Sequence, residues 1–104
     1  MSRVEFVNKV LALYLTADGK PSRVSRTDRL LAGSLYDQGF TVDQLETAFT
    51  LTEARRRFRD PEYPALSPIR SLHYFVPVLE EVKSTSIPDE YVRYLLYKLS
   101  RCGR

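Results

Sequence analysis

The stretch SRTDRLLAGSLYDQGFTVDQLETAF (residues 25–49) decides the fold class, because it holds the start of one helix, its end and the start of the next. Ser25, three residues before Asp28, forms a loose capping box, in which each side chain satisfies a backbone N–H at a helix start. Gly39 predicts a C-cap, since glycine adopts the left-handed conformation that ends many helices. Thr41, three residues before a glutamine, opens a second capping box. The passage predicts two consecutive helices joined by a short turn.

Apolar residues within these two helices recur at three- and four-residue intervals, which places one apolar stripe along each. The stripe residues are Leu30, Leu31 and Leu35 in the first helix, then Val42, Leu45, Ala48, Phe49, Thr52 and finally Phe58 in the second. Gly33 lies inside the first helix, where glycine costs roughly 1 kcal/mol against alanine. A close helix crossing is the predicted reason for the small residue. The second helix should be the longest in the chain.

The same signals predict one helix before this passage and two after it, at residues 2–16, 67–82 and 86–102. Serine followed by a proline marks the two later starts, and glycine or proline marks the breaks. The stripe residues are Val4, Val7, Val10, Leu11, Tyr14 and Leu15, then Ile69, Leu72, Phe75, Val76, Leu79 and Val82, and last Tyr91, Val92, Leu95, Leu96 and Leu99. Pro77 lies inside the fourth stripe, so we expect a kink there or a helix that begins nearer Ser71.

Length and composition fit this interpretation. A chain of 104 residues with 43% hydrophobic and 28% charged residues has ordinary globular composition. We expect an all-α fold, a compact bundle of about five helices with short loops and a proline-kinked fourth helix, in a single domain covering residues 1–104. Cys102 is the single cysteine, which excludes an internal disulfide. A single cysteine fits a reducing compartment, so we predict a cytoplasmic protein. The apolar run at residues 10–15 is too short to span a bilayer, so we expect no signal peptide and no membrane contact.

The inventory for catalysis is thin. The chain has one histidine, and its single cysteine, Cys102, lies at the end of the last predicted helix. His73 is placed on a helix, where a general base and a structural histidine are both compatible with the sequence. Glu80 and Glu81 are neighbours, so on a helix they point about 100 degrees apart and do not converge. The sequence therefore predicts a non-enzymatic protein without cofactor or metal.

Charged residues are segregated along the chain. The net charge is +3, and twelve of the sixteen basic residues are arginine, a bias that suits phosphate contacts and that a GC-rich genome also produces. The basic residues form three runs, Lys20, Arg23, Arg26 and Arg29, then Arg55, Arg56, Arg57 and Arg59, then Arg93, Lys98, Arg101 and Arg104, while Asp37, Asp43, Glu46 and Glu53 separate the first two.

Antiparallel packing of the second and third helices would bring the first two basic runs to one pole of the molecule. That pole predicts DNA binding of low sequence specificity, with Arg55, Arg56, Arg57 and Arg59 as the first candidates and Arg23, Arg26 and Arg29 as the second. Arginines at the end of a helix also complement its dipole, an alternative that stays open. A helix-turn-helix around Gly39 is disfavoured, since Asp43 and Glu46 would face the phosphates.

Tyrosines supply the rival hypothesis. The chain has seven, and Tyr91, Tyr94 and Tyr97 recur every third residue along the last helix. Tyrosine combines a ring face with a polar rim, which suits a nucleic-acid base or a protein partner. The alternative function is therefore a protein-interaction or dimerisation module that uses this helix.

Residues 27–82 resemble the helical DnaD-type domain of bacterial and phage replication initiation proteins. The resemblance rests on Asp28-Arg-Leu-Leu, on Gly39-Phe-Thr-Val-Asp-Gln-Leu-Glu-Thr-Ala-Phe, and on Tyr74-Phe-Val-Pro-Val-Leu-Glu-Glu-Val82. Tyr74 and Val78 match the first two places of that family's tyrosine–aliphatic–tryptophan motif, whereas Val82 replaces the tryptophan. The resemblance implies an accessory domain of a replication initiator or helicase loader, in a bacterial or mobile-element system, which binds DNA with little sequence preference and self-associates. The same three residues also form one helical stripe that could face the core.

Overall fold

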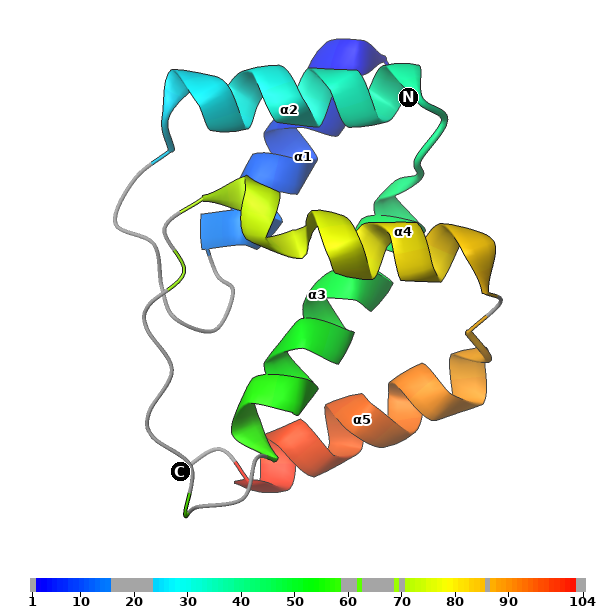
Figure 1. Cartoon of the computed structure of the whole chain (residues 1–104). Coiled ribbons are helices and arrows are strands. Elements are labelled where there is room, and N and C mark those ends of the chain that lie inside the picture. Colours follow the sequence, from blue (N-terminus) through cyan, green and yellow to red (C-terminus); the bar gives the residue numbers. More distant parts are fainter. Residues whose placement is uncertain are drawn as a thin grey trace.

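The computed structural model describes residues 2–15, 24–58, 62, 69, 71–85 and 87–102, and it shows an all-α bundle (Figure 1). Its elements are α1 (Arg3–Leu15), α2 (Arg26–Asp37), α3 (Val42–Arg57), the 3-10 helix η1 (Leu72–Phe75), α4 (Val76–Ser84) and α5 (Asp89–Cys102). The predicted fold class is confirmed, and α3 is the longest helix, as expected. No helix in the described part of the chain combines the length and apolar character that crossing a membrane requires.

Both predicted capping boxes are formed. At the start of α2, the Ser25 hydroxyl accepts a hydrogen bond from the Asp28 N–H, and the Asp28 carboxylate accepts one from the Ser25 N–H, each at 3.1 Å. At the start of α3, the Thr41 hydroxyl accepts from the Gln44 N–H at 3.2 Å, and the Gln44 side chain accepts from the Thr41 N–H at 2.9 Å. Gly39 follows the end of α2 with φ +93°, the left-handed conformation that glycine adopts without strain. The two capping boxes and the glycine C-cap predicted for residues 25–49 are therefore confirmed.

The fourth helical segment has two parts. Ser71 caps η1 by accepting a hydrogen bond from the His73 N–H at 3.1 Å, and α4 continues from Val76. Pro77 lies in the first turn of α4, where its missing N–H would have no helical partner in any case. Of the two alternatives, a start near Ser71 therefore agrees with the structure. The serine–proline starts predicted for the two later helices, at Ser67 and Ser86, and the end at Gly103 lie outside the described residues.

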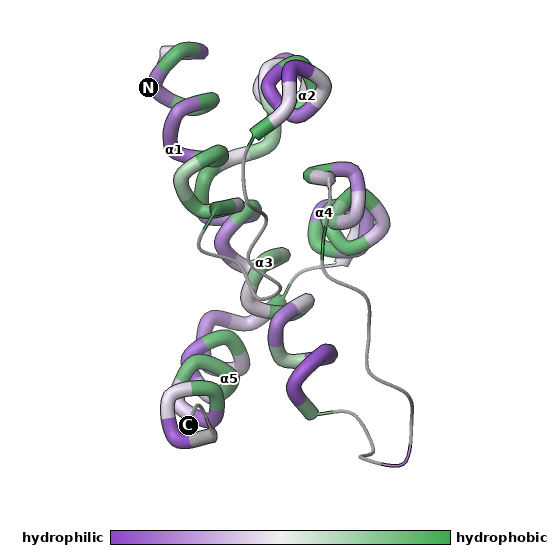
Figure 2. Tube along the Cα trace, turned by 90° about the vertical axis from the view of Figure 1, so that its left-hand side faces the viewer, coloured by the Kyte–Doolittle hydropathy of each residue, from purple (hydrophilic) through white to green (hydrophobic). Residues whose placement is uncertain are grey.

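Helix α3 is the centre of the arrangement. It packs against α1, α4, α5 and η1, whereas α2 packs mainly on α1 and η1, and α5 mainly on α3. In Figure 1, α2 crosses the top of the molecule, α5 crosses the bottom, and α3 runs between them. The side view in Figure 2 shows α2 and α5 at the same two ends. The antiparallel packing of α2 and α3, on which a single basic pole depends, is not formed, because the turn at Gly39 directs α3 away from α2.

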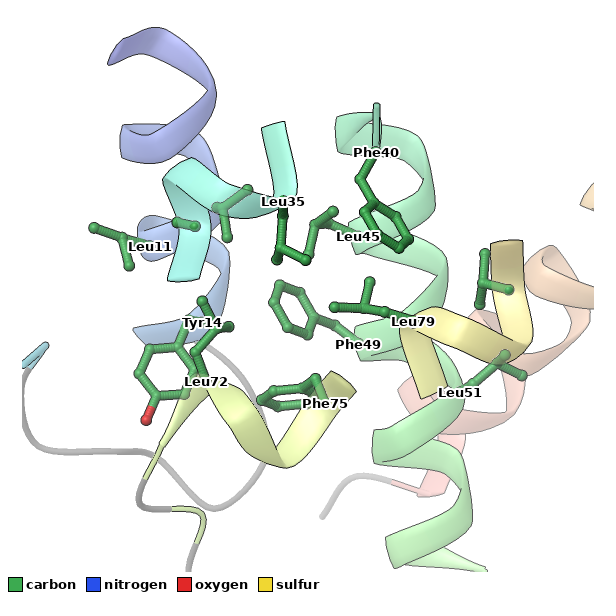
Figure 3. Packing of buried hydrophobic residues seen from close by; sticks show 14 of the residues in the cluster. Leu11, Tyr14, Leu35, Phe40, Leu45, Phe49, Leu51, Leu72, Phe75 and Leu79 are labelled. Atoms are coloured by element: carbon green, nitrogen blue, oxygen red, sulfur yellow. The ribbon is translucent and has the colours of Figure 1, made fainter. Parts of the chain in front are cut away.

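The core is built around aromatic rings (Figure 3). Phe75 of η1 is fully buried and meets Phe49 of α3 edge-on at 4.5 Å between ring centroids, and Tyr14 of α1 at 6.1 Å. Leu45 and Leu72 are fully buried beside them. Helices α1 and α3 are therefore joined through η1, which leads directly into α4.

Several residues that the apolar stripes predict to be buried are exposed in the structure. Val4 is 69% exposed and Leu30 is 63% exposed, and both line an open hollow between α1 and α2. Leu15 is also exposed, while Phe6, which the stripe omitted, is buried. The three- and four-residue spacing correctly predicts a helix. Which turns of that helix are buried depends on where a neighbouring helix crosses it.

The space beside Gly33 is filled by an arginine of α1, the helix that packs against α2. A Cβ atom built at Gly33 would lie 2.6 Å from a guanidinium nitrogen of Arg3. Arg3 extends past this point to Asp37, where Nε and Nη2 donate to the two carboxylate oxygens, both at 3.1 Å. The small residue makes room for a side chain that connects the start of α1 to the end of α2.

Candidate nucleic-acid interface

The arginines at the end of α3 are each held by another side chain. Arg55 donates two hydrogen bonds to the Glu81 carboxylate of α4, at 2.9 and 2.7 Å. Arg56 donates to the Tyr74 hydroxyl at 3.0 Å and lies over that ring, 5.5 Å from its centroid. These contacts bring together residues that are separated by 26 and 18 positions in the sequence.

The remaining arginines of this run differ in what the structure says of them. Arg57 lies 3.8 Å from the Glu53 carboxylate, one turn earlier in the same helix, and Arg59 lies outside the described residues. The hydrogen bond to Arg55, together with the attraction between the opposite charges, lowers the pKa of Glu81 below its usual range. Glu81 therefore stays ionised and offsets the charge of Arg55.

The second predicted group of arginines lies elsewhere. Arg26 and Arg29 are exposed at the start of α2, at the opposite end of the molecule from the end of α3 (Figure 1). Arg23 lies outside the described residues. The structure does not bring the two basic runs to one pole, since α2 and α3 do not pack antiparallel.

The tyrosine row meets the end of α3 instead. Tyr91 and Tyr94 are both about half exposed, and their rings stack at 6.4 Å between centroids with 30° between planes. The ammonium of Lys98 lies 4.7 Å from the Phe58 ring centroid, just after α3, and 5.6 Å from that of Tyr94. Arg55, in the last turn of α3, lies in the neighbourhood of Tyr91. We call Arg55, Phe58, Tyr91, Tyr94 and Lys98 the aromatic–basic surface.

Tyr97 and Arg101 extend this surface along α5. The Arg101 guanidinium lies 5.6 Å from the Tyr97 ring centroid and donates a hydrogen bond to the Tyr97 hydroxyl at 3.3 Å. The Tyr97 ring is more than half exposed. The sequence analysis assigns the arginines of α3 and the tyrosines of α5 to two alternative binding sites. Lys98 was available as the signal that links them, because it belongs both to the third basic run and to the helix of the tyrosines.

The other flank of α5 has the opposite character. Helical periodicity places residues 89, 92, 93 and 96 on a different side of α5 from residues 91, 94 and 98. With α3 and α1, that side forms an open groove of about 530 Å³. Its apolar lining comprises Leu13, Phe49, Val92 and Leu96, and its charged lining comprises Asp43, Glu46, Glu53, Asp89 and Arg93. Leu96 is 50% exposed, although it was predicted to lie on the buried stripe. We call this feature the acidic groove.

A serine, a histidine and an aspartate lie close together at the start of η1, but their order differs from that of a catalytic triad. The Ser71 hydroxyl lies 3.1 Å from Nδ1 of the exposed His73 and 3.3 Å from the Asp28 carboxylate. In a catalytic triad the histidine lies between serine and aspartate, where it removes the serine proton and is oriented by the acid. Here the serine lies in the middle and caps a helix. Within the described residues, no three potential metal ligands cluster.

Asp28 itself is a structural centre that the sequence identified only as a cap. Besides its contacts with Ser25 and Ser71, its carboxylate accepts a hydrogen bond from the Leu72 N–H at 2.9 Å. Burial raises the pKa of Asp28, but the hydrogen bonds from the Leu72 and Ser25 N–H groups and the two hydroxyls outweigh it and lower that pKa. One carboxylate thus holds α2 and η1 together.

The residues that carried the family resemblance are divided between core and surface. Tyr74 is exposed and bonded to Arg56, whereas Val82 is buried and Val78 is partly buried. The three do not form one binding face. No protein-family model, curated protein or solved structure matches the chain. The DnaD-type resemblance therefore stays a prediction.

Proposed function

We propose that this chain is a non-enzymatic nucleic-acid-binding domain that holds single-stranded segments on the aromatic–basic surface. The observation that carries the proposal is the position of Lys98 between the Phe58 and Tyr94 rings, next to the stacked pair Tyr91 and Tyr94. Exposed rings can stack on bases, and neighbouring cations can contact the phosphates between those bases. Both requirements are met within one surface.

Single strands fit this surface better than duplex DNA. Bases in a duplex already stack on one another, so a tyrosine row can reach them only where they are unpaired. Reading of the major groove by the start of α3 is disfavoured, because Asp43 and Glu46 lie there. The proposed ligand is single-stranded DNA or RNA with little sequence preference. A role in replication initiation rests on the DnaD-type resemblance alone.

The test is fluorescence anisotropy with labelled random-sequence 20-mers, single-stranded and duplex, titrated at several salt concentrations. We expect tighter binding of the single strand and an affinity that falls steadily as salt rises. Tyr94→Ala should weaken binding about tenfold, the effect of one lost base stack of about 1–3 kcal/mol. Lys98→Ala should weaken binding and reduce the salt dependence.

Arg26→Ala with Arg29→Ala is the matched control, since it removes the same type of charge at the opposite end of the molecule. It should leave the affinity within about twofold of wild type if the aromatic–basic surface is the site. Equal losses from both sets of substitutions would overturn the assignment of the site. Undetectable binding of either oligonucleotide near physiological salt would overturn the function itself.

A protein partner is the second candidate, because α5 exposes four large apolar or aromatic side chains, Tyr91, Tyr94, Leu96 and Tyr97. Such clusters on a surface are typical of protein interfaces. If these residues mediate dimerisation, the sedimentation mass rises with concentration, and replacement of Tyr94 and Tyr97 by serine lowers it. A monomer at all concentrations contradicts dimerisation through α5.

A further inference from the structure

The acidic groove combines apolar and charged features that neither the fold nor the aromatic–basic surface requires. Its floor includes Leu96, half exposed, together with the partly buried Leu13 and Val92. Exposed aliphatic side chains that line one open groove are typical of binding sites for apolar side chains of a ligand. The groove therefore offers apolar contact area that the chain's own helices leave uncovered.

The rim of the groove is negative although the chain carries a net charge of +3. Asp43 and Asp89 lie in the first turns of α3 and α5, where carboxylates also favour the helix dipole. Glu46 lies beyond the first turn and has no such role. In the described part of the chain, none of these three carboxylates has a hydrogen bond or ion pair with another residue. Four carboxylates and one guanidinium, that of Arg93, line the groove, and this excess of negative charge favours a cationic ligand.

We propose that the acidic groove binds a basic amphipathic helix of a partner protein. Apolar side chains on one face of that helix would lie on the floor, and lysine or arginine side chains on either side would pair with the carboxylates of the rim. The volume of about 530 Å³ accommodates the side chains of a short helical face. Nucleic acid is disfavoured as the occupant, because its phosphates would meet the carboxylates. This inference does not depend on the proposed function.

The test uses a synthetic helix whose leucines recur every three and four residues, whose other face carries lysine, and which contains one tryptophan. The protein has no tryptophan, so peptide fluorescence reports binding without background. We expect saturable binding, with a blue-shifted emission as the tryptophan enters the groove and an affinity that falls with salt. A peptide with the same leucines and tryptophan, but with glutamate in place of lysine, should not bind.

Charge reversal makes the test specific. Glu46→Lys combined with Asp43→Lys should weaken binding of the lysine peptide at least about tenfold and permit binding of the glutamate peptide. Glu80→Lys, a single charge reversal on the exposed part of α4 and outside the groove, is the control and should leave both affinities unchanged. Circular dichroism establishes that each variant is folded, and Leu96→Asn tests the floor without any change of charge.

Unchanged binding of the lysine peptide to the Glu46 and Asp43 variant would overturn the proposal. A second copy of this chain is the other occupant to examine. If sedimentation shows a dimer that the charge reversal dissociates, the groove is a self-association site and the proposal is wrong.

Discussion

The surroundings of Asp28 and the surface of α5 use polar residues in opposite ways. Asp28 is 1% exposed, and its carboxylate accepts hydrogen bonds from the N–H groups of Ser25 and Leu72 and from the Ser71 hydroxyl, at the starts of α2 and η1. Helix α5 packs mainly on α3 through Leu95 and Leu99, and it presents its polar and aromatic residues to solvent. The difference indicates that the first region maintains the architecture, whereas the second can change its residues at little cost to stability.

Substitution of Asp28 should have the largest effect on stability. Asp28→Ala removes a cap of α2 and leaves the buried Leu72 N–H without its acceptor, so we expect a loss of about 3 kcal/mol in the free energy of unfolding. Urea denaturation followed by circular dichroism measures it. Asp37→Ala, which removes an exposed carboxylate paired with Arg3, should cost less than about 1 kcal/mol. Similar losses in the two variants would contradict the structural role of Asp28.

Leu99→Ala should have the next largest effect, and a local one. Leu99 is buried against α3 and helps to anchor the end of α5, so truncation leaves a cavity and costs about 2 kcal/mol. Hydrogen exchange should accelerate through α5 and remain slow in α2 and α3, because α5 is attached mainly through α3. Equally faster exchange in all helices would show that α5 is not a separately opening unit.

Acid should weaken the Asp28 region selectively. Hydrogen bonds lower the pKa of folded Asp28 below the unfolded value of about 3.9, so its contribution is complete above pH 4 and is lost as pH falls through the folded pKa. We expect the free energy of unfolding of the wild type to fall below pH 4. Asp28→Asn should be less stable at pH 7 and should lose less on acidification. Parallel pH profiles for the two proteins would refute this linkage.

The two regions also differ in how far the sequence predicts them. The capping boxes at Ser25 and Thr41 and the turn at Gly39 are local arrangements, since their partners lie within three residues and the signal is complete in the sequence. The link from Asp28 to Leu72 spans 44 residues. The three-residue spacing of Ser25 and Asp28 identifies the cap, but it gives no information on the contact of Asp28 with Leu72.

The sequence predicts the arginines and the tyrosines of the candidate site, but not that they lie on one surface. Its arginines and tyrosines were identified, but the direction of α3 after Gly39 decides which of them meet, and spacing within a helix does not encode that direction. The exposure of Leu30 and Leu96 has the same origin, because a helical period gives the faces of a helix and not which face a neighbour covers. The acidic groove was visible only as a run of carboxylates along the chain.

The ion pair between Arg55 and Glu81 should have the smallest effect on stability and so gives the sharpest comparison with Asp28. Both side chains are about half exposed, and exposed pairs contribute less than about 1 kcal/mol, so Glu81→Gln should change the free energy of unfolding by no more than about 0.5 kcal/mol.

The same substitution removes a negative charge beside the aromatic–basic surface and releases Arg55 to contact phosphate. Anisotropy should show affinity for the single strand raised about threefold at low salt, with the gain disappearing as salt rises. Glu80→Gln, which removes the same charge at the neighbouring position without releasing Arg55, should raise affinity less. If Glu81→Gln instead destabilises the protein strongly and leaves affinity unchanged, Arg55 belongs to the architecture, as Asp28 does, and not to the binding surface.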